Sequence, residues 1–176
     1  GKVPTRKMPD IQVFGLDDAT LPRTMERYEG VMTGLRDEIA TAPRDAAGVP
    51  LVEAGVSPHA PYTVTVRPYR EAARYARRAG LRLATHVAES SAEVQVLARG
   101  SGPIAKAYRV AQLWTGASWT PPRMRPMEYV AAAGALSPDT LVIHAVEVNA
   151  AEIAILAGSG AAVAHCPRSN ARLRCA

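Results

Sequence analysis

The sequence predicts an α/β fold in which the strands of a parallel sheet alternate with helices along the chain. Short apolar runs of strand length are separated by longer segments whose apolar residues recur at helical spacing. Each of the four histidines follows one of these runs, at intervals of 27, 58 and 21 residues. Because parallel strands end at one edge of a sheet, the four histidines are expected to face a common site.

Three strands and two helices are predicted in the first half of the chain. The strands are Ile11–Gly15, Leu51–Val56 and Leu81–Thr85. The helices are Pro22–Ile39 and the stretch from Thr63 or Thr65 to Ala79. Threonine is a frequent N-cap, and the glycine at position 80 is typical of a helix carboxyl end. The second strand leads into a loop with prolines on both sides of His59, which stiffen the backbone there.

Two strands and three helices are predicted in the second half. The strands are Thr140–Ile143 and Ala161–Ala164, and the helices are Ser91–Ala98, Met127–Ala133 and Asn149–Ala157. Residues 99–126 form an enlarged loop that is rich in glycine and proline and connects two of these helices. Its two tryptophans, Trp114 and Trp119, could cover a flat ligand or pack the loop onto the body of the domain.

The composition is that of a globular protein without signs of nucleic-acid or membrane binding. Hydrophobic residues make up 48% of the chain and charged residues 21%. The net charge of +5 comes mainly from arginine. Five arginines share the predicted helix before Gly80, and we interpret them as a solvated face because no nucleic-acid motif accompanies them. No apolar run reaches the roughly 18 residues of a membrane span. The two cysteines, Cys166 and Cys175, form no CxxC pair, which favours a reducing, cytoplasmic setting.

The third predicted strand ends in a combination of residues that suits metal-assisted hydrolysis. His86 lies at its end, and Glu89 follows three residues later. Neutral imidazole is a common ligand of zinc, and a nearby carboxylate that is not a ligand can move protons for an activated water. The pair alone is weakly specific, so its value depends on the other strand-end histidines.

Four segments of the chain occur in an order and spacing that resemble a known family. They are Val56-Ser-Pro-His-Ala-Pro-Tyr-Thr63, Thr85-His-Val-Ala-Glu-Ser90, Val142-Ile-His144 and Ala164-His-Cys-Pro-Arg-Ser-Asn170. They resemble successive motifs of the amidohydrolase superfamily, in particular its cytosine deaminase and chlorohydrolase branch. Within that branch they look most like aminodeoxyfutalosine deaminases, enzymes of menaquinone biosynthesis, and S-adenosylhomocysteine/methylthioadenosine deaminases.

The resemblance implies a (β/α)8 barrel with a divalent metal at the carboxyl ends of its strands. The metal is usually zinc, with iron, nickel or manganese as alternatives. The resemblance also implies that His86 is a metal ligand and that Glu89 is a proton shuttle that contacts the substrate base. By the same resemblance, His144 orients or polarises the attacking hydroxide.

The resemblance further implies a set of substrate contacts. His59 looks like a substrate-binding histidine, and Ser169 and Asn170 match a motif that contacts substrate in this family. For His165 and this motif, holding the loop in place is as good an interpretation as contacting the substrate.

The implied reaction is hydrolytic deamination of a small-molecule 6-aminopurine nucleoside. Metal-activated hydroxide would attack C6, Glu89 would transfer protons to the ring and to the leaving amine, and ammonia would depart. A guanine deaminase or chlorohydrolase type of amidohydrolase is an alternative, as is a catalytically inactive binding domain or remnant. The zinc deaminases with Pro-Cys-x-x-Cys ligands are excluded because this spacing does not occur.

The chain also departs from the family pattern. It contains no His-x-His pair, which the first barrel strand would supply, and no metal-binding aspartate for the eighth strand. We therefore interpret residues 1–176 as a single partial barrel domain, about strands three to seven, with residues 171–176 as cloning or frameshift sequence. Alone, it is expected to bind metal weakly, to have negligible deaminase activity, and to expose sheet edges that favour aggregation, a homo-oligomer or completion by another segment.

Overall fold

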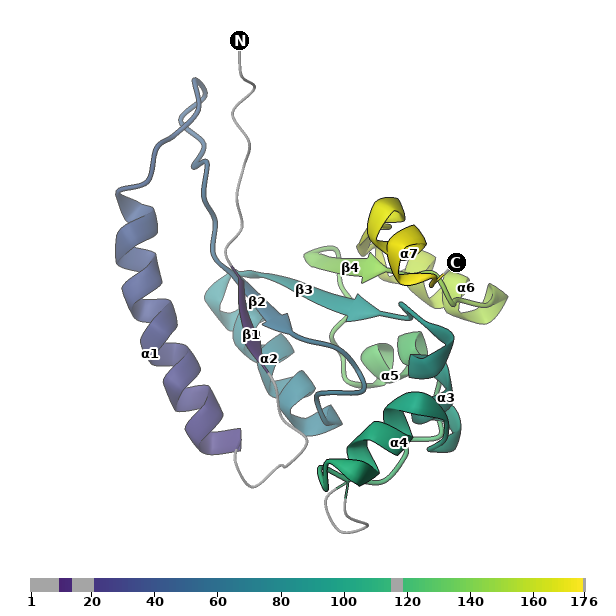
Figure 1. Cartoon of the computed structure of the whole chain (residues 1–176). Coiled ribbons are helices and arrows are strands. Elements are labelled where there is room, and N and C mark those ends of the chain that lie inside the picture. Colours follow the sequence, from purple (N-terminus) through teal and green to yellow (C-terminus); the bar gives the residue numbers. More distant parts are fainter. Residues whose placement is uncertain (1–9, 14–20, 115–118, 176) are drawn as a thin grey trace.

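In the computed structural model, a parallel sheet of five strands runs through the described part of the chain, residues 10–13, 21–114 and 119–175 (Figure 1). The strands are β1 (Asp10–Val13), β2 (Gly55–Pro58), β3 (Arg82–Val87), β4 (Thr140–His144) and β5 (Ala162–Ala164). Each strand pairs with the next in sequence order. Crossovers between neighbouring parallel strands are right-handed as a rule, and in this strand order that rule places the connecting helices on one face, as in the wall of a barrel.

Seven helices connect or follow these strands in the described residues. They are α1 (Leu21–Ala40), α2 (Val66–Ala79), α3 (Ser91–Arg99), α4 (Gly102–Val110), α5 (Pro126–Ala132), α6 (Ala150–Ser159) and α7 (Pro167–Leu173). Their ends follow from local chemistry. The side chains of Ser90 and Asn149 accept hydrogen bonds from the first turns of α3 and α6. Gly80 ends α2 in the left-handed conformation, with φ of 62°, which glycine adopts without steric cost.

The helix α2 shows how the sequence pattern becomes packing. Its buried residues include Tyr69, Ala72, Ala73 and Ala76, at the i, i+3, i+4 and i+7 positions of one helix face. The small alanines let this face approach the sheet closely. The arginines of α2, namely Arg67, Arg70, Arg74, Arg77 and Arg78, are exposed, which confirms the prediction of a solvated face.

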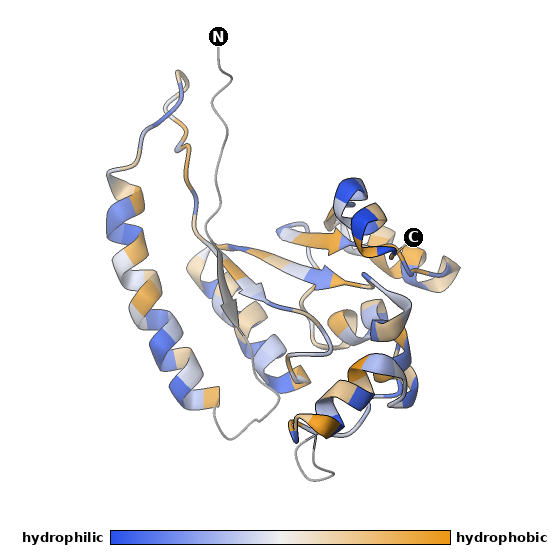
Figure 2. Cartoon of the chain, in the orientation of Figure 1, coloured by the Kyte–Doolittle hydropathy of each residue, from blue (hydrophilic) through white to orange (hydrophobic). Residues whose placement is uncertain are grey.

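The main core lies between the helices and the sheet. It contains Tyr28 and Met32 of α1, the α2 face, and Val56, Leu83 and Val142 of three neighbouring strands. A hydrophilic stretch near the arrowhead of β3 stands out against the apolar residues before it (Figure 2). Val56, Leu83 and Val142 therefore anchor β2, β3 and β4 in the core, and the strand-end histidines lie at the carboxyl edge of the sheet.

Several predicted boundaries differ from the structure. The second strand was expected over Leu51–Val56 but runs over Gly55–Pro58, because residues 51–54 are irregular, with an isolated bridge residue at Val52. Residues 99–126, expected as a loop, contain the helix α4, and the helix α7 was not predicted. The first strand was predicted over Ile11–Gly15, and the last two of these residues lie outside the described part.

The two tryptophans of this connection pack against the domain. Trp119 belongs to a second core cluster with Val96 and Leu97 of α3. The rings of Trp114 and Trp119 meet edge to face with centroids 4.9 Å apart, and the guanidinium of Arg109 lies 4.7 Å from the centroid of the Trp114 ring. These contacts favour the packing interpretation over that of a ligand cover.

Among the described residues, no helix has the length and apolar character needed to cross a membrane.

Candidate functional site

The predicted convergence of the histidines is present in the structure. His59 directly follows β2, His86 lies near the end of β3, His144 is the last residue of β4, and His165 directly follows β5. The rings of His59 and His86 have centroids 5.2 Å apart, and those of His86 and His144 are stacked at 5.5 Å. Three imidazoles thus form a row across adjacent strand ends, and the fourth histidine is tied to this row through the backbone.

The Nδ1 atom of each of the four histidine rings faces an oxygen atom of the protein, which for His59 is the hydroxyl oxygen of Thr63. The Nδ1 atom of His86 lies 3.0 Å from the carbonyl oxygen of His59, and that of His165 lies 2.9 Å from the carbonyl oxygen of His144. The Nδ1 atom of His144 lies 2.7 Å from the Oδ1 atom of Asn170. For His86 and His165, an Nδ1–H donor to the backbone carbonyl leaves Nε2 as the nitrogen with a lone pair, the form that binds a metal or accepts a proton.

Glu89 and His144 form the polar pair at the centre of this edge. The Oε1 atom of Glu89 lies 3.3 Å from the Nε2 atom of His144. Both neighbouring backbone segments are unusual, since Ala88 has φ of 53° and His144 has φ of 77°. Left-handed backbone at residues other than glycine is energetically costly and concentrates at functional sites. Here it turns the ends of β3 and β4 so that the two side chains meet.

The residues predicted from the last motif have distinct environments. Asn170, on α7, is buried, and both ends of its amide are occupied: Oδ1 faces His144, and Nδ2 donates to the carbonyl oxygen of His165. These contacts make it a residue that holds His144. Ser169 and His165 are exposed. A direct substrate contact by Ser169 or Asn170 stays a prediction.

The surroundings of His59 favour its neutral form. Burial lowers its pKa, the nearby His86 lowers it further, and Glu89 acts in the opposite direction. The Nδ1 atom of His59 lies 2.7 Å from the hydroxyl oxygen of Thr63. The Tyr62 ring approaches His59 edge to face at 6.1 Å, and burial raises the pKa of Tyr62 to about 12. This side of the edge therefore combines a neutral imidazole with a protonated phenol.

A buried carboxylate supports the loop that carries Glu89. Glu93, in the first turn of α3, is fully buried and accepts hydrogen bonds from the backbone N–H groups of Ala88 and Glu89. Burial raises its pKa to about 8, although the two N–H donors act against this, and the charges of Glu89 and Glu152 add to the increase.

The pKa of Glu93 predicts a pH-dependent stability. Its folded-state pKa of about 8 exceeds the ordinary value of 4.5, so the folded chain keeps a proton that the unfolded chain releases between these values. Below pH 4.5, the contribution of Glu93 to the free energy of unfolding is therefore complete. As the pH rises from 4.5 toward about 8, this contribution falls by up to about 1.4 kcal/mol per pH unit. Urea unfolding across this range should show a smaller pH dependence for Glu93→Gln. Parallel pH profiles for the two proteins would contradict the assignment.

The donor set suits a divalent metal only in part. His86 offers an imidazole whose Nδ1 is engaged by a backbone carbonyl, which is the usual arrangement of a metal-binding histidine. Among the described residues, however, no group of three or more His, Cys, Asp or Glu side chains is arranged to hold a metal ion. The described residues thus supply a candidate ligand and not a complete site.

A cavity of about 600 Å³ lies at the opposite edge of the sheet, where the strands begin. Its lining includes Arg36, Arg77, Arg82 and Asp139. Arg36 and Arg77 donate hydrogen bonds to backbone carbonyls, at the end of α2 and after α5 respectively. These contacts explain Arg36 and Arg77 as structural groups, and the candidate chemistry remains at the histidine edge.

Sequence reasoning missed Glu93 and the contact between Asn170 and His144. A signal for Glu93 was present, because Ser90 and Glu93 have the spacing of a helix capping box. In the structure, Ser90 caps α3 as this pattern indicates. The Glu93 side chain instead reaches one and two residues further back, to the N–H groups of Glu89 and Ala88.

Comparison with known proteins places the chain among hydrolases of one family. Residues 5–175 match the model of the Amidohydrolase family. An aminodeoxyfutalosine deaminase from Deinococcus radiodurans is 36% identical over 131 residues, which cover 72% of this chain and 31% of the relative. A 5-methylthioadenosine/S-adenosylhomocysteine deaminase from Teredinibacter turnerae is 33% identical, over 70% of this chain and 23% of the relative. The chain thus spans about a third or less of the length of these relatives.

Solved structures show the same fold. The crystal structure of Helicobacter pylori aminofutalosine deaminase has a TM-score of 0.70 at 17% identity and covers 93% of this chain and 38% of that protein. An adenosine deaminase from Xanthomonas campestris, crystallised with bound zinc, has a TM-score of 0.67 at 22% identity and covers 98% of this chain and 33% of that protein. The predicted partial (β/α)8 barrel is therefore confirmed as the fold class.

Proposed function

Because the chain belongs to the Amidohydrolase family, we propose that it forms part of a metal-dependent hydrolase that deaminates a 6-aminopurine nucleoside derivative. The observation that carries this proposal is the shared orientation of the strand-end imidazoles. Their Nδ1 atoms are occupied by protein oxygens, and the Nε2 atom of His144 faces a carboxylate, that of Glu89. Such an edge can bind a cation and exchange protons with a substrate.

In this proposal His86 is one ligand of a divalent metal, most commonly zinc in enzymes of this kind. A metal held there would provide an activated water as the nucleophile. The interactions of His86 support this role, because the backbone N–H and the ring Nδ1 both lie 3.0 Å from the carbonyl oxygen of His59. Two contacts to one oxygen fix the orientation of the ring relative to the neighbouring strand.

Proton transfer is assigned to Glu89. Its side chain is 22% exposed and therefore accessible to a ligand. The peptide group before it is held by Glu93 on one side and by the loop after β4 on the other. In the ionised state it accepts a proton from the attacking water, and in the protonated state it donates to the purine ring and to the leaving amine. His144 holds the carboxylate in position and orients the nucleophile, and Asn170 in turn fixes the His144 ring.

Recognition of the purine is assigned to the β2 side of the edge. His59 is half-buried and favours the neutral form, so it can donate or accept a single hydrogen bond with a base. Ser169 on α7 is exposed and can reach a polar group of the substrate, and Asn170 has its amide committed to the histidines. The deaminases of D. radiodurans and T. turnerae support an adenine nucleoside as the substrate class.

A substrate panel tests this proposal. The natural gene product, supplied with zinc, would be incubated with aminodeoxyfutalosine, S-adenosylhomocysteine, 5′-methylthioadenosine, guanine and a chlorotriazine, and ammonia and chloride release would be measured. We expect ammonia from at least one adenine nucleoside. Ammonia from guanine alone, or chloride from the triazine alone, would replace this proposal with another reaction of the same family. Turnover of none of these compounds would favour an inactive binding domain.

A further inference from the structure

We propose that Glu93 is a positioning residue that fixes the peptide between Ala88 and Glu89 and thereby aims the Glu89 carboxylate at His144. The catalytic consequence rests on the proposed function, in which Glu89 moves protons. The way in which Glu93 holds the loop after β3 does not depend on that function.

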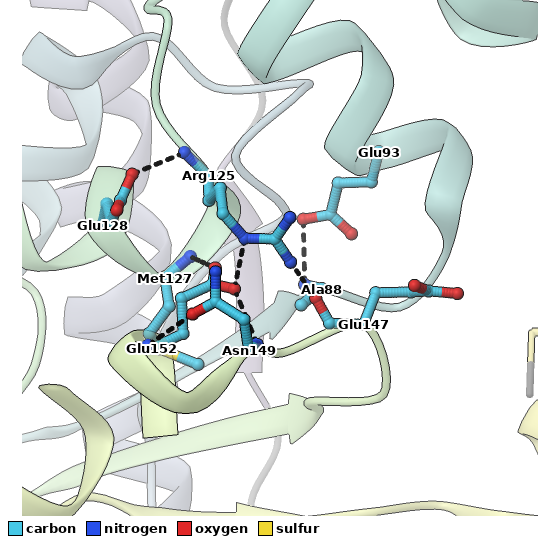
Figure 3. A network of polar contacts seen from close by, with 8 residues as sticks. All are labelled: Ala88, Glu93, Arg125, Met127, Glu128, Glu147, Asn149 and Glu152. Atoms are coloured by element: carbon cyan, nitrogen blue, oxygen red, sulfur yellow. Dashed lines mark hydrogen bonds and ion pairs between the residues drawn. The ribbon is translucent and has the colours of Figure 1, made fainter. Parts of the chain in front are cut away.

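Glu93 holds this loop from the side of α3. Its Oε1 atom accepts the Ala88 N–H at 3.0 Å, and its Oε2 atom accepts the Glu89 N–H at 2.9 Å. The side chain is fully buried, so solvent does not compete for these bonds. Figure 3 shows the Glu93 side chain reaching from its helix toward the Ala88 backbone. Ser90 caps the same helix and fixes the position from which Glu93 reaches back.

The opposite side of the same peptide is held by the loop after β4. The carbonyl oxygen of Ala88 accepts hydrogen bonds from the N–H groups of Val146 and Glu147, each at 2.9 Å. This carbonyl and the Glu89 N–H belong to one peptide group. The group that precedes the Glu89 side chain is therefore bound at both ends, by α3 on one side and by the β4 loop on the other.

The backbone conformation shows what these bonds achieve. Ala88 has φ of 53°, a left-handed conformation that an alanine leaves readily unless its neighbours hold it. Release of the Glu93 bonds would let Ala88 relax toward an ordinary conformation and would turn Glu89 away from the Nε2 atom of His144, now 3.3 Å from its Oε1 atom. Glu93 thus acts through Glu89 and does not need to touch the substrate.

A second buried carboxylate provides an internal comparison. Glu152 of α6 is also fully buried and accepts the N–H groups of Met127 and Asn149, together with the guanidinium of Arg125 (Figure 3). Both carboxylates hold loop amides, but only Glu93 holds the loop of Glu89. Replacement of either one should cost stability, whereas only the Glu93 replacement should release the Ala88 and Glu89 amides.

Amide hydrogen exchange of the 176-residue chain tests the positioning role. Glu93→Gln keeps the size of the side chain but can accept only one of the two N–H groups, and Glu93→Asp is too short to reach them. We expect exchange at the amides of Ala88 and Glu89 to become at least about 10-fold faster in both variants, with the Met127 and Asn149 amides unchanged. Glu152→Gln should show the reverse pattern. The proposal would be overturned if a Glu93 variant accelerated exchange equally at the Ala88 and Glu89 amides and at the Met127 and Asn149 amides. No change at Ala88 and Glu89 would overturn it as well.

A measurement on the unmodified chain keeps the test valid if the variants fail to fold. The ¹⁵N and ¹H shifts of the Ala88 and Glu89 amides should move together with pH and report one ionisation, because both amides donate to the Glu93 carboxyl group. Burial raises the pKa of that group to about 8. The titratable groups that face Glu93 are Glu89, Glu152, Tyr62 and Tyr69, and Arg125 is bound to Glu152. The Met127 amide, which is bonded to Glu152, serves as the reference. Ala88 and Glu89 amide shifts that do not titrate would contradict the role.

The catalytic consequence has its own readout. In an active natural gene product, Glu93→Gln should lower kcat at least about 10-fold and leave KM within about 3-fold, because a misaligned proton shuttle slows chemistry more than binding. An unchanged kcat would overturn the catalytic part of the inference. If the natural protein deaminates nothing, the proposed function fails, and the exchange pattern still decides whether Glu93 holds the loop.

Discussion

Replacement of Glu89 with glutamine is expected to lower the kcat of aminopurine deamination by about 10²- to 10⁴-fold, the usual contribution of a general acid–base group. Glutamine has the same shape and can keep a hydrogen bond to His144, now 3.3 Å from Glu89, but it cannot accept and return a proton. The measurement is ammonia release by the zinc-supplied natural gene product, with substrate well above KM. The fold should persist, because Glu93 binds the backbone of Glu89 and not its side chain.

The matched control for this change is Glu71→Gln. Glu71 lies on α2 and pairs with the exposed Arg74 on the outer face of that helix. The Glu71→Gln variant should keep kcat within about 2-fold of the unmodified protein, since an exposed ion pair contributes little to the stability of the fold. Equal losses of activity in the two variants, or full activity of Glu89→Gln, would remove Glu89 from the proton-transfer step.

Replacement of Arg125 with alanine is expected to lower the free energy of unfolding by about 3–5 kcal/mol, because it leaves a buried carboxylate without its cation. The Nε atom of Arg125 lies 2.6 Å from the Oε2 atom of Glu152, and its Nη2 atom donates to the carbonyl oxygen of Glu147 at 2.7 Å. The Glu152 side chain has no exposed surface, and that of Arg125 is 29% exposed. Urea unfolding followed by circular dichroism measures the change.

Arg74→Ala is the comparison for this second prediction. Arg74 also lies 2.8 Å from a glutamate, Glu71, but the two side chains are 54% and 33% exposed. Its loss should cost less than about 1 kcal/mol. If Arg125→Ala and Arg74→Ala destabilise the chain equally, burial does not determine the contribution of these ion pairs.

The overall fold was predictable because its strands and helices depend on local patterns. The apolar runs before His86, His144 and His165 became β3, β4 and β5, since short apolar runs bounded by turn residues favour strands of a parallel sheet. Glycines and capping residues defined the ends of α2, α3 and α6 for the same local reason. The meeting of the histidines then followed from the parallel direction of the strands.

The remaining features depend on contacts between distant residues. The role of Asn170 is visible only when α7 lies over the end of β4, where its Oδ1 atom meets His144. The helix α4 lies within a stretch rich in glycine and proline, and it is held by the hydrogen bond from Tyr108 to the carbonyl oxygen of Tyr62, 46 residues away. No local pattern specifies either contact.

The position of the candidate site was predictable from its motifs, but its ligand set was not. His59, His86, His144 and Glu89 lie together as their motifs indicate, but their chemistry depends on a ligand set that the described residues supply only in part.

Product analysis in ¹⁸O-labelled water tests the central claim most directly. The natural gene product, supplied with zinc, would be incubated with an adenine nucleoside, and the product would be examined by mass spectrometry. Hydrolytic deamination predicts ammonia and a 6-oxopurine nucleoside with one ¹⁸O atom at C6, and Glu89→Gln should form it far more slowly. A product without solvent oxygen at C6, or unchanged nucleoside with both proteins, would contradict the assignment of the histidine edge as an aminopurine deaminase site.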